Sequence, residues 1–226
     1  MRTADGKKQS PGKAVLIRDI YSVLDRHYGD LKWWPGETPF EVIVGAILTQ
    51  NTSWDNVARA VANLKSAGML CPFRLYSAPP GRIAELIRPS GYYNVKTMRL
   101  RHFLHFLHDG FGGDIDEMFR LDTLELRTLL LSVNGIGEET ADSILLYAGG
   151  KPVFVVDAYT KRLLQRHWII PEGCSYAGVK AIFESCLPPD PAVYNQFHAL
   201  IVQTGKDFCR KKPLCGECPL RLLNHE

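Results

Sequence analysis

Apolar residues recur at helical spacing along most of this 226-residue chain, and patterns typical of strands are almost absent. The first helical pattern covers about residues 15–24 and stops near Gly29. The apolar run at residues 40–49 is interpreted as a buried helix, because another helical pattern follows at 54–64 with no hairpin signal between them. Further helical patterns lie at residues 80–107, where Pro89 to Gly91 divide two helices, and at 122–132, 141–148, 158–167, 175–186 and 190–205. The chain is therefore predicted to be all-α.

The composition predicts a chain with a packed core, but it does not decide whether the chain binds nucleic acid. Hydrophobic residues make up 46% and charged residues 23% of the chain, which excludes overall disorder. No apolar stretch reaches the roughly eighteen residues that a membrane span needs, and the polar start MRTADGKKQSPGK lacks the apolar region of a secretory signal. We therefore expect a cytoplasmic, nucleoid-associated protein with no membrane partner. The net charge of +3 permits nucleic-acid binding without requiring it.

Two predicted helices flank the glycine-containing turn Val133-Asn134-Gly135-Ile136-Gly137. Glycines two residues apart let the backbone turn tightly and approach another surface without a Cβ in the way. The free N–H groups at the start of the following helix attract an anion such as a DNA phosphate. A plain turn between two helices has the same pattern. An acid, Asp157, follows the apolar run PVFVV, twenty residues after Gly137.

Four segments together resemble one protein family. The segment LSVNGIGEETADSILLYAGGKPVFVVDAYTKRLL resembles the helix-hairpin-helix, Gly/Pro-rich loop and Asp signature of the endonuclease III superfamily of DNA glycosylases. FEVIVGAILTQNTSWDNV, RPSGYYNVKTMRL and FCRKKPLCGECPL are similar to its buried helix and Gln-bearing loop, its Gly-Tyr-Asn-x-Lys segment and its iron–sulfur loop. The likeness covers roughly residues 30–220.

The resemblance implies an architecture and a partner. It predicts a six-helix domain at residues 31–149 that contains the hairpin. A discontinuous domain of residues 1–30 and 150–226 would carry the acid and the cysteine loop. Double-stranded DNA with a damaged base would bind in the groove between the domains, and the protein would be a monomer.

The resemblance makes Asp157 the catalytic acid. A carboxylate suits glycosidic bond cleavage, because it stabilises a sugar that becomes an oxocarbenium-like cation or orients the attacking water. By local sequence alone, Asp157 is also a good N-cap for a helix that begins at Ala158. Both roles are compatible.

Glu139 stands where bifunctional members of the family carry a lysine. Their pattern is Gly-x-Gly-x-Lys-Thr-Ala, whereas this chain has Gly-Ile-Gly-Glu-Glu-Thr-Ala from Gly135. The lysine attacks the sugar and forms a Schiff base, and a carboxylate cannot form an imine. We therefore expect a monofunctional glycosylase that uses water and leaves an abasic site.

This glutamate, the LTQNT loop and the tryptophan–proline loop look most like the 3-methyladenine DNA glycosylase branch. A 3- or 7-alkylated purine is already cationic, so it leaves without a general acid. Electron-rich rings select such a base by cation–π stacking. Trp33, Trp34, Pro35 and Glu139 are therefore predicted to line the base pocket, although both tryptophans also suit a buried core.

The resemblance places further residues on the DNA. Gln50 matches the side chain that enters the gap left by the extruded nucleotide, with Asn51 beside it. Lys96 is expected either to contact a phosphate or to be a solvated lysine on the surface. The remaining predicted DNA contacts belong to the hairpin: Gly135, Ile136, Gly137 and Thr140.

Cys209, Cys215 and Cys218 form a cluster near the C-terminus, a spacing that suggests metal in a reducing compartment. Family members with a [4Fe–4S] cluster use four cysteines, and the fourth position falls here on Asn224. A cluster with a substitute ligand such as His225 or a distant cysteine, a zinc site, and a site without metal all stay open. The basic residues around the cysteines are expected either to grip phosphates or to be a solvated surface.

Other functions remain compatible with these motifs. A non-catalytic protein that binds DNA damage would keep the glycines and lose the acid, but Asp157 is present. A glycosylase with AP lyase activity on oxidised pyrimidines would need another amine in place of Glu139. A mismatch adenine or thymine glycosylase differs in its pocket residues.

Overall fold

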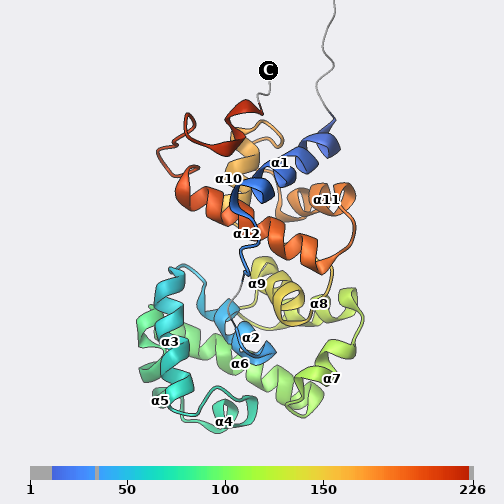
Figure 1. The fold of residues 1–226 in the computed structure, drawn as a ribbon. Coiled ribbons are helices and arrows are strands. Elements are labelled where there is room, and N and C mark those ends of the chain that lie inside the picture. Colours follow the sequence, from blue (N-terminus) through green and yellow to red (C-terminus); the bar gives the residue numbers. More distant parts are fainter. Residues whose placement is uncertain (1–11, 34–35, 224–226) are drawn as a thin grey trace, which may run out of the picture. The chain divides into compact units, whose positions relative to one another are not determined.

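The computed structural model describes residues 12–33 and 36–223. Within these ranges the chain forms α-helices with short 3₁₀ and π segments and contains no strand, which confirms the all-α prediction (Figure 1). None of the described helices is long and apolar enough to cross a membrane. Trp34, Pro35, Asn224 and His225 lie outside the described residues.

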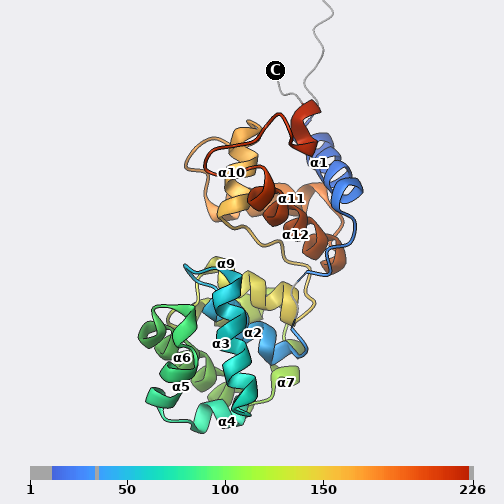
Figure 2. The same ribbon diagram turned by 60° about the vertical axis from the view of Figure 1, so that its left-hand side comes forward.

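The chain divides into two compact units. The central unit comprises residues 36–153, and the terminal unit joins residues 12–33 to residues 154–223. The divisions follow residues 33 and 153, where the sequence predicted domain boundaries after residues 30 and 149. The pairing of an N-terminal helix with the C-terminal third gives the terminal unit its discontinuous character (Figure 2).

The central unit is built around one apolar helix, α2 (Pro39–Leu48), which packs against α3, α6 and α9. Residues Phe40 to Leu48 are buried apart from half-buried Glu41, as expected for a helix that is apolar on every side. The other helices are α3 (Trp54–Ser66), α4 (Pro72–Ser77), α5 (Pro80–Leu86), α6 (Tyr93–Phe111), α7 (Ile115–Arg120), α8 (Thr123–Ser132) and α9 (Glu138–Ser143). A 3₁₀ turn lies at Arg88–Ser90, and a π-helical segment, Ile144–Ala148, continues α9.

Helices α4 and α7 are additional to the six helices expected in this region. Each has six residues, which is too short for an apolar repeat to show. Local signals start them: Pro72 opens α4, and the Asp114 carboxylate accepts the N–H groups of Asp116 and Glu117 in α7.

The terminal unit consists of α1 (Lys13–Tyr28), α10 (Ala158–Arg166), α11 (Tyr176–Cys186), α12 (Pro191–Asp207) and a 3₁₀ turn at Pro219–Leu222. Helix α12 packs against α10 and α1, and α1 also packs against α11 (Figure 2). The Phe154 and Phe183 rings stack at 3.8 Å between centroids, and Phe197 meets Phe183 edge-on at 5.3 Å. The three C-terminal helices lie where their apolar periodicity predicted them.

Candidate functional site

Asp157 is the N-cap of α10, and its two carboxylate oxygens have different surroundings. Oδ1 accepts hydrogen bonds from the backbone N–H of Thr160 at 2.7 Å and from its hydroxyl at 2.9 Å. Oδ2 lies 3.7 Å from Nε2 of His198. The side chain is 13% exposed. One oxygen is thus held by the helix, and the other faces an imidazole.

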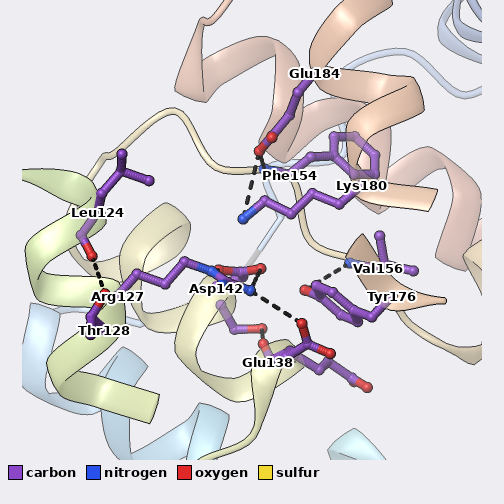
Figure 3. A network of polar contacts seen from close by, with 12 residues as sticks. Leu124, Arg127, Thr128, Glu138, Asp142, Phe154, Val156, Tyr176, Lys180 and Glu184 are labelled. Atoms are coloured by element: carbon purple, nitrogen blue, oxygen red, sulfur yellow. Dashed lines mark hydrogen bonds and ion pairs between the residues drawn. The ribbon is translucent and has the colours of Figure 1, made fainter. Parts of the chain in front are cut away.

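The segment before Asp157 is extended and held by side chains of α11. The Phe154 N–H donates to Glu184 Oε1 at 3.0 Å, and the Val156 N–H donates to the Tyr176 hydroxyl at 3.3 Å (Figure 3). Lys180 lies 3.7 Å from the same Glu184 oxygen. Side chains of a neighbouring helix thus satisfy two N–H groups of the apolar run PVFVV, which is extended but pairs with no strand among the described residues.

Trp33 lies beside His198, with their ring centroids 6.5 Å apart at an interplanar angle of 71°. The Lys206 ammonium lies 5.3 Å from the Trp33 ring centroid. The indole Nε1 is buried without a hydrogen-bond partner among the described residues. Trp33 therefore lies one side chain away from Asp157, while the pocket roles of Trp34 and Pro35 stay predictions.

His198 is 5% exposed and packs between Trp33 and Phe154. Burial lowers the pKa of the imidazole, and the Asp157 charge partly opposes that shift. This residue was not predicted from the sequence, because a histidine on an apolar helix face gives no signal of the acid that it will meet.

In the central unit, α8 and α9 form the predicted hairpin. Gly135 has a φ of +94°, and a Cβ at this position would collide with the Arg99 side chain. Gly137 caps α9 with extended backbone, and a Cβ added there would meet no atom within 4 Å. No side chain caps α9. The fold thus requires glycine at 135, whereas at 137 the protein itself imposes no steric limit.

Gln50 joins the loop after α2 to the hairpin. Its amide Nε2 donates to the Gly135 carbonyl at 3.0 Å and to the Thr140 hydroxyl at 2.9 Å. Arg99 on α6 donates to the Gln50 Oε1. The structure therefore brings together Gln50, Gly135 and Thr140, three of the predicted DNA contacts. Ile136 is buried, and Asn51 is exposed with a φ of +56°.

An ion pair that the sequence did not reveal holds the hairpin helices together. Arg127 of α8 binds both carboxylate oxygens of Asp142 in α9, at 2.7 and 3.2 Å. It also lies 3.6 Å from Glu138 (Figure 3). The Asp142 side chain is fully buried. Glu139 is exposed on the first turn of α9, and it and Asp157 belong to different units.

Lys96 has a different place from the one expected. The residue is 1% exposed, and its ammonium donates to the Ser90 carbonyl at 2.6 Å. Burial, with a smaller effect of Arg99, lowers the pKa of Lys96 to about 8. The amine points into the central unit, so in this conformation it is not available to a phosphate.

The three clustered cysteines line one small cavity in the terminal unit, together with His167 and Arg166. Cys209 and Cys218 are buried and Cys215 is exposed. Burial and the neighbouring Cys209 and Cys215 raise the pKa of the Cys218 thiol. Thiolates are soft donors that suit iron–sulfur clusters or zinc. Within residues 12–33 and 36–223, no three potential ligands gather at single-ion spacing.

Comparison with known proteins bears on both units. Residues 44–189 match the family model described as HhH-GPD superfamily base excision DNA repair protein. This range includes the Gln50 loop, the hairpin and Asp157.

Individual relatives extend over most of the chain. A DNA repair glycosylase of Methanocaldococcus jannaschii is 50% identical over 92% of this chain and 96% of its own length. Endonuclease III of Thermotoga maritima is 30% identical over 93% of this chain and 90% of its own. The crystal structure of H. pylori 3-methyladenine DNA glycosylase bound to 1,N6-ethenoadenine is similar with a TM-score of 0.72. It is 28% identical and covers 87% of this chain and 98% of that one.

Proposed function

Because the chain belongs to the HhH-GPD superfamily of base excision DNA repair proteins and is a DNA glycosylase of that family, we propose that it is monofunctional and hydrolyses the N-glycosidic bond of alkylated purines. The observation that carries this proposal is Glu139 in the position of the family's lysine nucleophile. Without an amine there, water is the nucleophile that the reaction needs, and the product is an abasic site.

Asp157 supplies the negative charge for this reaction. As the base leaves, positive charge develops on the sugar, and a carboxylate placed nearby lowers the barrier or orients the water. Thr160 holds Oδ1 through two hydrogen bonds, so the carboxylate keeps one orientation while Oδ2 stays available. A fixed charge of this kind needs no rearrangement when the bond breaks.

The choice of alkylated purines rests on the leaving group and the tryptophans. A 3- or 7-alkylated purine carries a positive charge, so it departs without protonation. The Trp33 ring already accepts the Lys206 ammonium at 5.3 Å, which supports its use as a cation-binding surface. The 28% identical H. pylori relative is named a 3-methyladenine DNA glycosylase. We propose the same substrate class for this chain.

The DNA interface proposed for the central unit is the hairpin with the Gln50 loop. The N–H groups at the start of α9 would bind one phosphate, and the open space at Gly137 lets the backbone approach it. Contacts of this kind fix the register of the duplex and carry no sequence information. Gln50 would leave the hairpin carbonyl to enter the gap of an extruded base.

The test is base release from defined DNA. Methylated duplex DNA, and duplexes with an oxidised pyrimidine, a uracil or a thymine mismatch, are incubated with enzyme, and free bases are identified by chromatography. We expect release of 3-methyladenine or 7-methylguanine, and none from Asp157→Asn at unchanged DNA affinity. Release from the other duplexes alone would refute the alkylpurine proposal, and an active Asp157→Asn would refute the role of this acid.

A second candidate, glycosylase with lyase activity on oxidised pyrimidines, follows from the 30% identical relative named endonuclease III. Borohydride reduction separates the two candidates. A Schiff base would be trapped as a covalent enzyme–DNA adduct, and we expect none for this chain. A trapped adduct would show that another amine replaces the missing lysine.

A further inference from the structure

His198 lies between two residues that the proposed function uses. Its Nε2 is 3.7 Å from Oδ2 of Asp157, the oxygen that Thr160 does not hold. Its ring meets the edge of Trp33, a predicted pocket residue. It belongs to the middle of α12, whereas Asp157 begins α10, and these two helices pack against each other.

The surroundings of His198 fix the plane of its ring. Trp33 and Phe154 contact it at 71° and 78°, each with centroids 6.5 Å from the imidazole. Phe154 is itself held by Glu184 through its N–H. An imidazole packed in this way between two aromatic rings has little freedom to turn away from the carboxylate.

The distance between Nε2 and Oδ2 is slightly longer than a hydrogen bond. Hydrogen bonds at active sites are often long in the free enzyme and tighten when substrate binds. Thr160 already holds Oδ1 of Asp157, so a further hydrogen-bond donor would act on Oδ2.

We propose that His198 is a positioning residue for the glycosylase reaction, in which its Nε2–H donates to Oδ2 of Asp157 and orients the carboxylate toward the sugar. This proposal rests on the proposed function. Its chemistry depends on the imidazole being neutral. A neutral donor fixes the oxygen and leaves the full negative charge of Asp157 for the developing cation, whereas a lysine or arginine would cancel that charge.

The charged groups around His198 are consistent with a neutral ring. Burial among aromatic rings is the dominant influence and lowers the pKa of His198, while Asp157 from α10 acts in the opposite direction. Lys206, on the same helix, lies over the Trp33 ring, with its ammonium 5.3 Å from the ring centroid.

The activity test uses a matched pair of variants, His198→Gln and His198→Met. Glutamine and methionine have the same length and similar volume, but only glutamine offers an N–H near the position of Nε2. With methylated duplex DNA under single-turnover conditions, we expect His198→Met to lose about tenfold to a hundredfold in the rate of base release. His198→Gln should stay within a few-fold of wild type, and both should bind the duplex with unchanged affinity.

Thermal unfolding of the two variants is the structural control. Equal midpoints with unequal rates support the hydrogen bond, because packing is then unchanged. Equal rate losses in both variants, or wild-type rates in both, would overturn the proposal.

A second measurement does not depend on activity. In ¹⁵N NMR spectra of the wild-type protein, we expect His198 to be the Nε2–H tautomer, with a resonance that shifts in Asp157→Asn. Asparagine must keep its carbonyl on the Thr160 N–H, so its NH₂ group would face Nε2 and could not accept the hydrogen bond. A deprotonated Nε2, or a His198 resonance that does not shift in Asp157→Asn, would refute the hydrogen bond between His198 and Asp157. Wild-type protein that shows the pairing but releases no methylated base would refute the proposed substrate alone.

Discussion

The two glycines of the hairpin turn have different steric surroundings. Gly135 sits at a φ of +94° against Arg99, so the fold itself excludes a side chain there. Gly137 has open space around its Cβ direction and a φ of −94°, so the fold tolerates one. A glycine that the protein does not need for its own structure is expected where another molecule comes close, and this distinction gives a test.

We expect Gly135→Ala to lower the free energy of unfolding by about 1–3 kcal/mol, because the backbone is strained and Arg99 must move. Gly137→Ala should change stability by less than about 1 kcal/mol yet weaken binding to duplex DNA. Urea unfolding and fluorescence anisotropy with a labelled duplex measure the two effects. Equal stability losses, or unchanged DNA affinity for Gly137→Ala, would contradict this division of roles.

Lys96 gives a prediction for the pH dependence of stability. Its pKa is about 8 in the folded chain against 10.5 for an unperturbed lysine. Between these values the unfolded chain binds more protons, so the folded state gains stability as the pH rises. Below pH 8 both states hold the proton and the cost of the buried charge is fully present.

Relative to Lys96→Met, the wild-type protein should therefore gain about 2 kcal/mol between pH 7 and pH 9.5. Chemical unfolding of both proteins at the two pH values measures the difference, in which other titrating groups cancel. The substitution also removes the hydrogen bond from the Lys96 amine to the Ser90 carbonyl, which changes the free energy of unfolding by the same amount at both pH values. A difference that stays constant with pH would mean that Lys96 titrates normally.

At the scale of elements, the hairpin is held by its buried ion pair as well as by its turn. Arg127 and Asp142 connect α8 to α9 close to the turn that the DNA phosphate would meet. Asp142 is fully buried, so the loss of the Arg127 guanidinium takes a cationic partner away from a buried carboxylate.

We expect Arg127→Met to lower the free energy of unfolding by about 3–5 kcal/mol. The double variant Arg127→Met, Asp142→Leu should recover much of this loss, since no charge is left buried. Arg120→Ala, which breaks an exposed pair with Glu117 on α7, is the control and should have little effect. Denaturant melts report all three, and a double variant no more stable than Arg127→Met would argue against the ion-pair explanation.

The helices were predictable from sequence, but their contacts were not. Apolar periodicity located α1, α2, α3, α6 and α10 to α12, and an acid after the apolar run identified the cap of α10. Gln50 and Gly135, which form a hydrogen bond, are 85 positions apart in the sequence. Arg99, which donates to Gln50, is 49 positions away from it. Lys96 was expected on the surface, because a single charged residue in a helix reveals nothing about the fold that encloses it. Tertiary packing decides such contacts, and no local pattern records it.

At the scale of the whole molecule, the terminal unit depends on contacts between α1 and α12, which are far apart in the sequence. The Tyr28 hydroxyl donates to Asp207 at 3.0 Å, and Gln196 donates to Asp25 and to the Gly29 carbonyl. The loop that carries the cysteines follows α12 directly and is tied to α10. Arg162 donates to the Cys209 carbonyl at 2.6 Å, and Arg166 donates to the Arg210 carbonyl at 2.7 Å. The loop thus has protein contacts of its own before any metal binds.

We propose that the cysteine cavity holds a [4Fe–4S] cluster, since Cys209, Cys215 and Cys218 line it and soft donors suit iron–sulfur chemistry. Protein purified without oxygen should absorb near about 400 nm and contain about four iron atoms per chain. Cys209→Ser should lose both signals, while Cys71→Ser, a cysteine of the central unit, should keep them. Because Arg162 and Arg166 hold the carbonyls of Cys209, Arg210 and Lys211, removing the metal should loosen the following segment, residues 212–217, more than it unfolds α10. Proteolysis confined to this segment after iron chelation would show that effect. A colourless protein with one zinc, or with no metal, would refute the cluster.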